Sequence, residues 1–242
     1  METAFQQHDS VLPSFWQEME ARIAKYDLLC HPFYQAWSAG TLTREDLRHY
    51  AGNYYQHVAA FPTYLAALYC RLEDGELRHA IVANLLDEEG LDGNPANRPH
   101  SELWLDFAEG MGAEREQARK TEPVAEVAEV VSNFRRVAME CSPAEALAAF
   151  YAYESQVPRV AKEKARGLRE MYGADAKTCG YFTLHTTADV YHANVWRDQL
   201  SKLVADDPNQ QEQALAAAEN AARCLWNALD GIERERQQRK AA

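Results

Sequence analysis

The chain has 242 residues, and its 25 Lys and Arg stand against 37 Asp and Glu, for a formal net charge of −12. A chain this acidic lacks the basic face that binds nucleic-acid phosphates or anionic lipids. No run approaches the roughly 20 apolar residues of a membrane span, and the opening residues METAFQQHDS do not follow the plan of a signal peptide. We therefore expect a single cytoplasmic domain over residues 1–242 that binds neither nucleic acid nor membrane.

Apolar residues recur with helical spacing nearly everywhere, and strand-like alternation never persists. Ser142-Pro143-Ala144-Glu145 forms a capping box, and the segment from Gly90 to Pro99 is typical of a loop. Pro62 and Pro158 each interrupt a pattern that resumes afterwards, so each predicts a kink within a helix. The predicted helices span 13–39, 43–71, 74–90, 100–110, 122–140, 143–172, 176–205 and 209–236. The sequence thus predicts an all-α bundle of seven to eight helices, with a charged helix end at 232–242.

Two glutamates lie on helix faces that should be buried. Glu88 continues the stripe of Ile81 and Leu85 within IVANLLDEEG. A buried, unpaired carboxylate is costly, so Glu88 either has a partner or lies at the solvated end of its helix. Its neighbours Asp87 and Glu89 can simply be solvated.

Glu154 is harder to explain as a surface residue. It lies in the middle of a stripe with Leu147, Phe150, Val157 and Ala161 on both sides. The predicted helix begins about eleven residues earlier, which excludes a capping role. We expect Glu154 to be paired or to bind a metal.

A third face carries His185, Asp189 and His192 at positions i, i+4 and i+7 of the predicted helix over 176–205. Lone histidines on apolar faces are often hydrogen-bonded core residues, but two histidines and an aspartate on one face favour metal binding. His100, which begins HSELW after the loop, is a further candidate. Mixed carboxylate and imidazole ligation is typical of non-haem iron or manganese, whereas structural zinc sites prefer thiolates. Helical bundles build dimetal sites from such residues.

The segments HPFYQAW, NLLDEEG, HSELW, YAYESQVPRVAKEKARGL and YFTLHTTADVYHANVW resemble the CADD family. This is the chlamydial protein associating with death domains with its bacterial relatives, in the TenA/PqqC haem-oxygenase-like superfamily. The resemblance covers about residues 25–205 and implies a haem-oxygenase-like bundle that holds two metal ions, iron/iron or iron/manganese, in place of haem. The ligands that it implies are Glu88, His100, Glu154, His185, Asp189 and His192. Glu88 and His100 lie 12 residues apart, farther than in the family pattern, so Glu89 stays an alternative to Glu88.

The resemblance also implies an activity. Its members resemble O₂-dependent p-aminobenzoate synthases that supply folate synthesis, taking the ring from one of their own tyrosines and the amino group from one of their own lysines. The matching residues are Tyr34 in HPFYQAW and Lys164 in AKEKARGL, with Tyr50 as a further tyrosine near the site. O₂ and an external reductant would be co-substrates, from an electron donor that the sequence does not identify. Without the resemblance, Tyr34 could equally be an aromatic residue of the core. Lys164 lies in a charged run and points about 80° away from the helix face of Glu154, so the sequence alone favours a solvated position for it.

Three other functions stay open. The same dimetal site can serve an external small molecule, or the protein can be a cofactor-free oxidase like the PqqC branch, which the carboxylate-rich cluster opposes. An interaction protein is the third, although nothing in the sequence marks a docking surface. Bundles of this kind often form homodimers, and we expect one here without a pattern that identifies the interface.

Overall fold

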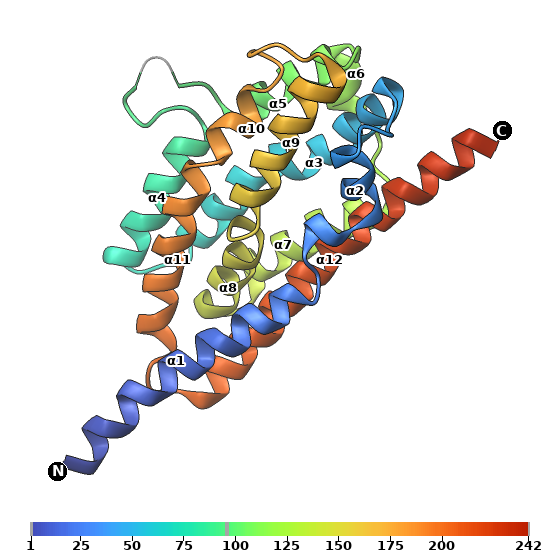
Figure 1. Ribbon diagram of the computed structural model, residues 1–242. Coiled ribbons are helices and arrows are strands. Elements are labelled where there is room, and N and C mark those ends of the chain that lie inside the picture. The colour runs from blue at the N-terminus through green and yellow to red at the C-terminus, as the bar shows by residue number, and fades with distance from the viewer. Residues whose placement is uncertain (1, 95–96, 242) are drawn as a thin grey trace.

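The computed structural model describes residues 2–94 and 97–241, with side chains from residue 12 onward. Every regular element of this part of the chain is a helix, which confirms the all-α prediction (Figure 1). None of these helices is long and apolar enough to cross a membrane. The helices are α1 (Glu2–Ala24), the 3₁₀ helix η1 (Leu28–Cys30), α2 (Pro32–Ser38), α3 (Arg44–Tyr69), α4 (Glu76–Glu88), α5 (His100–Gly110), α6 (Arg115–Lys120), α7 (Ala125–Glu140), α8 (Pro143–Glu154), α9 (Val157–Tyr172), α10 (Gly180–His185), α11 (Ala188–Val204) and α12 (Pro208–Ala241).

Local sequence sets several helix starts. At α8 the Ser142 Oγ accepts from the Glu145 amide at 3.3 Å, and the Glu145 carboxylate accepts from the Ser142 amide at 2.9 Å. Thr43 and Asp46 form the same reciprocal pair at the start of α3. In both capping boxes, side-chain oxygens accept from amide groups at the helix start, which have no main-chain carbonyl partner within the helix.

Three of the long predicted helices are interrupted. The segment 13–39 divides into α1, η1 and α2, because Asp27 caps η1 and His31-Pro32 begins α2. The predicted kink at Pro158 is wrong: α8 ends at Glu154, and Pro158 lies in the first turn of α9, where its missing N–H costs nothing. Pro62 does lie inside α3, as predicted.

The third interruption divides 176–205 into α10 and α11 at Thr186 and Thr187. The two hydroxyls donate to carbonyls three residues earlier, Thr186 to Thr183 at 2.7 Å and Thr187 to Leu184 at 3.2 Å. Such local bonds compete with the helical ladder. The short helix α6 lies in a stretch for which the sequence predicted none.

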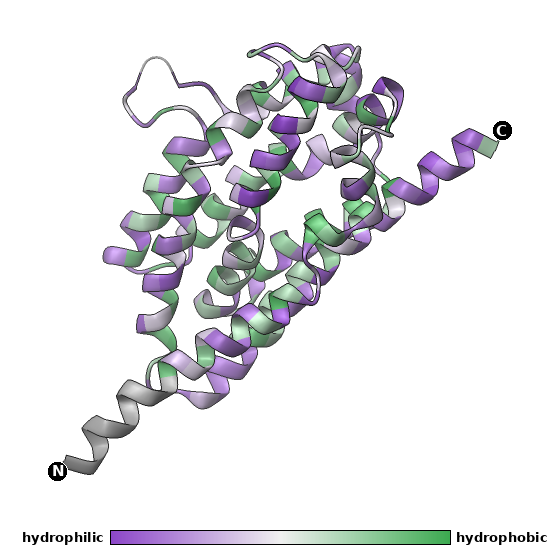
Figure 2. Cartoon of the chain, viewed as in Figure 1, coloured by the Kyte–Doolittle hydropathy of each residue, from purple (hydrophilic) through white to green (hydrophobic). Residues whose placement is uncertain are grey.

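The long helix α12 lies along one edge of the bundle, with α1 beside it and α7 and α8 packed on its inner side (Figure 1). About half of the buried residues of α12 and of α8 are alanines, so the two backbones can approach closely. The last turns of α12 are hydrophilic (Figure 2). Helix α3 packs against α4, α5 and α7 on the other side.

One close approach brings α2 against α9. A Cβ on Gly167 would lie 2.8 Å from Cδ1 of Trp37, so only glycine admits the indole at this distance. Trp37 is 1% exposed and follows Tyr34 by one turn of α2. Gly167 likewise follows Lys164 by three residues on α9. The glycine therefore allows the two helices to bring Tyr34 and Lys164 together.

Candidate metal centre

Six ionisable side chains converge inside the bundle from five helices. None is more than 5% exposed. They are Glu88 of α4, His100 of α5, Glu154 of α8, His185 of α10, and Asp189 and His192 of α11. Glu89 is exposed, so the structure brings Glu88 and not its neighbour into this cluster.

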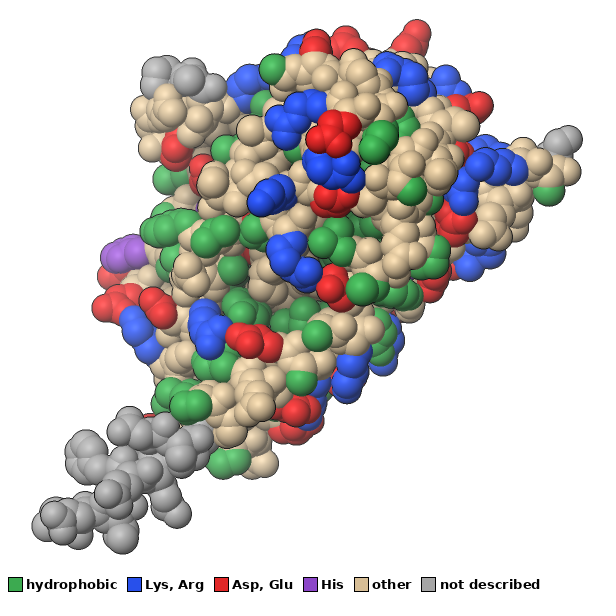
Figure 3. Space-filling view, viewed as in Figure 1, with side chains coloured by type: hydrophobic (Ala, Val, Ile, Leu, Met, Phe, Trp, Pro, Cys, Tyr) green, Lys and Arg blue, Asp and Glu red, His purple; other side chains and the backbone are tan. Residues whose placement is uncertain are grey.

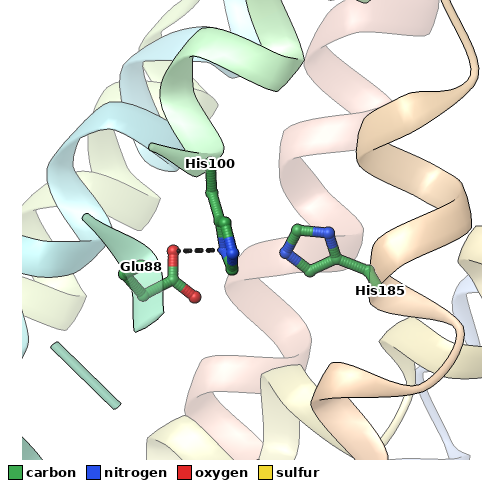
Figure 4. A group of neighbouring side chains, drawn as sticks. All are labelled: Glu88, His100 and His185. Carbon is green, nitrogen blue, oxygen red and sulfur yellow. Dashed lines mark ion pairs between the residues drawn. The ribbon is translucent and has the colours of Figure 1, made fainter. Parts of the chain in front are cut away.

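The cluster contains two groups that share Glu88. In one group, ligand atoms of Glu88, His100 and His185 lie within 4.8 Å of one another, and in the other those of Glu88, Glu154 and His192 do so. Figure 4 shows the first group, with Glu88 and His185 on opposite sides of the His100 ring. Asp189 adjoins the second, its Oδ1 lying 3.6 Å from Nδ1 of His192. Because Glu88 belongs to both groups, its carboxylate could bridge two neighbouring cations.

Helix ends, and not helix middles, supply most of these residues. Glu88, Glu154 and His185 are the last residues of α4, α8 and α10, and His100 is the first of α5. The C-terminal end of a helix carries a partial negative charge of about half an electron, which disfavours a carboxylate and favours a cation. Three such ends therefore add to the attraction of the site for metal ions.

This arrangement corrects two premises from the sequence. Glu154 does not lie in mid-helix, because α8 ends there. His185, Asp189 and His192 do not share one helical face, because the break at Thr186 and Thr187 separates His185 from the other two. The break matters, since it places His185 and His192 in different groups.

Neighbouring groups fix how three of the side chains point. The Nδ1 of His185 lies 2.7 Å from the main-chain carbonyl of Tyr181, to which it donates, so its Nε2 keeps a lone pair. Asp87 lies 3.1 Å from Nε2 of His192 and leaves Nδ1 facing the cluster. The indole of Trp196 donates to Oε2 of Glu154. Such contacts are typical of the residues that orient metal ligands.

Several other polar atoms of the cluster have no hydrogen-bond partner within the part of the chain that the structure describes. His100 Nδ1, Glu154 Oε1, Asp189 Oδ2 and His192 Nδ1 are buried without a hydrogen-bond partner among the described residues. His100 Nδ1 lies 2.9 Å from Glu88 Oε2, an ion pair when the imidazole is protonated. Each unsatisfied buried polar group costs about 1–3 kcal/mol, and native structures have few of them. A mixed carboxylate and imidazole set with free lone pairs fits iron or manganese.

Protons occupy part of this cluster when no cation does. Burial, with the nearby Asp189 and Glu88 carboxylates, raises the pKa of Glu154 well above its usual range. Burial alone would lower the pKa of His100 and His192, but Glu88 acts on the first and Asp189 and Asp87 on the second, and both pKa values rise. His192, whose pKa rises to about 11, therefore holds a proton near neutral pH, and Glu154 and His100 hold theirs to higher pH than they would in water.

A second polar group lies farther along the interior. Lys164 is 5% exposed, and its Nζ donates to Oη of Tyr34 at 2.7 Å and to Oη of Tyr50 at 2.6 Å. The two hydroxyls lie 2.9 Å from each other. Burial, with no carboxylate to offset it, lowers the pKa of Lys164 well below its usual range. The solvated position that the charged run suggested for Lys164 is therefore wrong.

Three further tyrosines connect this group to the cluster. The ring of Tyr50 stacks on that of Tyr54 at 5.4 Å between centroids. Tyr54 is hydrogen-bonded to Tyr153, and Tyr153 to Tyr181. The Tyr181 ring stacks on His185 at 4.0 Å. We call Tyr50, Tyr54, Tyr153 and Tyr181 the tyrosine chain.

Sequence reasoning missed the tyrosine chain beyond Tyr50, and it treated Asp87 as solvated. Tyr153 is the residue before Glu154, and Tyr181 lies one turn before His185, so adjacency to proposed ligands was the only available signal. Asp87 had none, because its role depends on the packing of α4 against α11.

We predict that metal binding will release protons and strengthen as pH rises, because a cation must displace protons whose pKa values are raised at Glu154, His100 and His192. Titration calorimetry with ferrous or manganous ion in buffers of different ionisation enthalpy measures this release.

We predict that Glu88→Gln will lose both metal ions, because Glu88 is shared by the two groups, while the exposed control Glu89→Gln keeps both, as metal analysis of the purified proteins would measure. Two metal ions per chain retained in Glu88→Gln would contradict the assignment.

Comparison with known proteins identifies the family of the chain. Residues 48–226 match the family model of iron-containing redox enzymes with a haem-oxygenase-like fold. The chain is 37% identical to a 4-aminobenzoate synthase of Chlamydia pneumoniae over 221 residues, covering 91% of this chain and 96% of that one. It is also 37% identical to a 4-aminobenzoate synthase of Nitrosomonas europaea over 229 residues, covering 90% and 91%.

The fold has solved counterparts as well. A haem oxygenase-like domain of unknown function from Shewanella denitrificans superposes with a TM-score of 0.78 at 16% identity, covering 95% of this chain and 94% of that one. The sequence relatives span nearly the whole of both chains, and the family model matches most of this one. The chain therefore belongs to the CADD family, within the haem-oxygenase-like iron-containing redox enzymes.

Proposed function

We propose that this chain synthesises 4-aminobenzoate from its own residues, taking the ring of Tyr34 and the amino nitrogen of Lys164. The observation that carries the proposal is the buried Lys164 Nζ, held 2.7 Å from the Tyr34 hydroxyl without an acidic partner. The similarity to 4-aminobenzoate synthases over nine-tenths of the chain supports it. The product would be available for folate synthesis.

Glu88, His100 and His185 would hold one metal ion, and Glu88, Glu154 and His192 the other, with Asp189 beside the second. When bound, two redox-active ions, iron/iron or iron/manganese, would supply the electrons that activate O₂, and an external reductant would restore them. The carboxylates neutralise the ions, and Asp87, Trp196 and the Tyr181 carbonyl keep the ligands in place.

The position of Lys164 matches the chemistry of the product. In 4-aminobenzoate the nitrogen stands para to the carboxylate carbon, as the tyrosine hydroxyl stands para to Cβ. Lys164 Nζ lies 2.7 Å from that hydroxyl and 4.1 Å from the Tyr34 ring centroid, at the end of the ring where nitrogen must enter. The new C–N bond replaces the ring C–O bond of Tyr34, whose oxygen leaves as water. The Cα–Cβ bond of Tyr34 and the Cε–Nζ bond of Lys164 must also break, and Cβ must be oxidised to the carboxylate, with O₂ as oxidant and the external reductant balancing the electrons.

Lys164 must be neutral to use its lone pair. Aromatic faces surround Nζ and favour a cation, but each such contact contributes only about 0.5–2 kcal/mol. Burying an ammonium ion without a counter-ion costs several kcal/mol, which is the larger effect. A neutral amine can donate its two hydrogens to Tyr34 and Tyr50 and keep a lone pair, which can also accept a phenolic proton.

The tyrosine chain gives Tyr34 a route to the metal centre. No described contact joins Tyr34 to a proposed ligand directly, while hydrogen bonds and stacked rings run from Tyr50 to His185. An electron taken from Tyr34 can pass along these rings, and its phenolic proton can move to Lys164. This supports a reaction on Tyr34 at a distance from the ions.

The cavity beside this group argues against an external aromatic substrate at Lys164. Its volume is about 20 Å³, and its lining includes Tyr34, Tyr54, Lys164 and Tyr181. About 10–15 Å³ of such volume holds one water molecule, so this cavity admits a water or O₂ but no second ring. The only aromatic ring available to Lys164 is one that the protein already carries.

We predict that Tyr34→Phe will form no 4-aminobenzoate while it keeps its two metal ions, because the hydroxyl that marks the site of nitrogen entry is gone. Product can be measured by mass spectrometry after adding reductant and O₂ to protein grown with ring-deuterated tyrosine. Wild type should give deuterated product at no more than one molecule per chain. Unlabelled product, or undiminished product from Tyr34→Phe, would exclude Tyr34 as the source.

We predict that Lys164→Met will be more stable than wild type at neutral pH, by about 1–4 kcal/mol, although it is inactive. The pKa of Lys164 is lowered on folding, so the unfolded chain binds more protons below its ordinary pKa of about 10.4. The cost therefore shrinks as pH rises, and the gain in the variant should be smaller at pH 9 than at pH 7. Urea unfolding measures both.

The matched control for this stability effect is the exposed Lys162→Met, two residues away, which should change the free energy of unfolding by less than about 0.5 kcal/mol. Tyr34 and Tyr50 still bond each other in Lys164→Met, so no hydroxyl loses its only partner. A destabilised Lys164→Met at every pH would contradict a neutral, costly amine.

We predict that Tyr181→Phe will reduce 4-aminobenzoate per chain at least tenfold, since phenylalanine is much harder to oxidise and lacks the hydrogen bond to Tyr153. His185 keeps its orientation, because its partner is the main-chain carbonyl of residue 181. Metal content should therefore stay unchanged. Tyr64→Phe is the control, a buried tyrosine whose hydroxyl has no partner among the described residues. Equal yields from both variants would remove the tyrosine chain from the reaction.

A further inference from the structure

A cleft of about 570 Å³ lies between α4 and α11 and reaches the metal cluster from outside. This volume is within the range of small-molecule sites. Hydrophobic side chains gather on the surface over this part of the molecule (Figure 3). The residues that line the cleft are Ala80, Ala83, Asn84, Asp87, Asp92, Leu184, Thr187, Ala188, Tyr191, His192 and Val195.

Asn84 is the unusual residue of this lining. It is 4% exposed, one turn before Glu88 on α4, and neither its Nδ2 nor its Oδ1 has a hydrogen-bond partner among the described residues. A buried amide without partners is rare, because both its donor and its acceptor lose their water. An occupant that offers a donor and an acceptor side by side would satisfy both atoms at once.

The rest of the lining restricts the charge and shape of that occupant. Asp87 and Asp92 make the cleft acidic, and Asp87 already pairs with His192. An anion, including the carboxylate of 4-aminobenzoate, is therefore disfavoured. Alanine methyl groups on both helices and the ring of Tyr191 provide apolar walls. A neutral, planar molecule with a lactam edge fits this combination.

We propose that the cleft binds a neutral flavin-type ring whose lactam pairs with Asn84, and that the reduced ring supplies electrons to the metal centre. The role as reductant rests on the proposed function, which consumes electrons. His192 lines the cleft and also belongs to the metal cluster, so a ring bound here lies one imidazole from an ion. The dihydro ring gives up two electrons and two protons and becomes the oxidised ring. Two trivalent ions held by the cluster around Glu88 would serve as the one-electron acceptors, and the protons would leave to solvent through the open cleft.

Binding is tested with lumiflavin, which is neutral and carries no phosphate, by quenching of its fluorescence on titration with metal-loaded protein. Asn84→Leu removes both amide atoms without changing side-chain size, and replacing an unsatisfied polar group keeps the fold. It should weaken binding at least about tenfold, which corresponds to 1.4 kcal/mol. Ala80→Trp fills the cleft and should abolish binding, while the exposed Ala128→Trp on α7 is the control and should bind like wild type.

Saturable binding that is insensitive to salt, weakened at least about tenfold in Asn84→Leu and lost in Ala80→Trp, would support the site. The site would be overturned if wild type showed no saturable binding, or if Asn84→Leu and Ala80→Trp both bound lumiflavin as tightly as wild type. Anaerobic mixing of dihydrolumiflavin with the oxidised metal-loaded protein then tests the role: reduction should be at least tenfold slower in Ala80→Trp, and equal rates would overturn it. If wild type yields 4-aminobenzoate with ascorbate but binds no lumiflavin, this inference fails while the proposed function stands.

Discussion

The structure depends on a group of ionisable side chains gathered in the buried interior. Three carboxylates and three imidazoles, none more than 5% exposed, converge with several of their lone pairs unused. In a medium of low dielectric, such a group is stable only if protons or cations compensate it. The raised pKa of Glu154 is the response of the metal-free chain. Cations would replace those protons, and the helix ends that point at the cluster favour them.

Lys164 is a second buried ionisable group, separate from the metal cluster, and it has no carboxylate or other ion beside it to compensate a charge. Its low pKa places a neutral amine against two phenols, at a stability cost that a purely structural role would not justify. The tyrosine chain joins the two regions through closely packed rings. Redox chemistry at the ions and nucleophilic chemistry at the amine can therefore proceed in separate places within one core.

Sequence periodicity predicted the helical class and the inward faces of Glu154 and His192, because these depend on local spacing. For Glu88 it left a partnered carboxylate and a solvated helix end as alternatives. It did not predict the break at Thr186 and Thr187, where two hydroxyl bonds decide against a helix that the apolar pattern favours. Periodicity also did not predict the burial of Lys164, because it depends on the contact of Gly167 with Trp37 between two helices. Asp87 and the distant tyrosines needed tertiary packing to acquire a role.

The most direct test of this account is anomalous diffraction at the iron and manganese edges from crystals of the metal-loaded protein. We expect two peaks within bonding distance of Glu88, one also bound by His100 and His185 and the other by Glu154 and His192. A single peak, or ions bound away from Glu88, would contradict the shared-carboxylate centre on which the proposed chemistry rests.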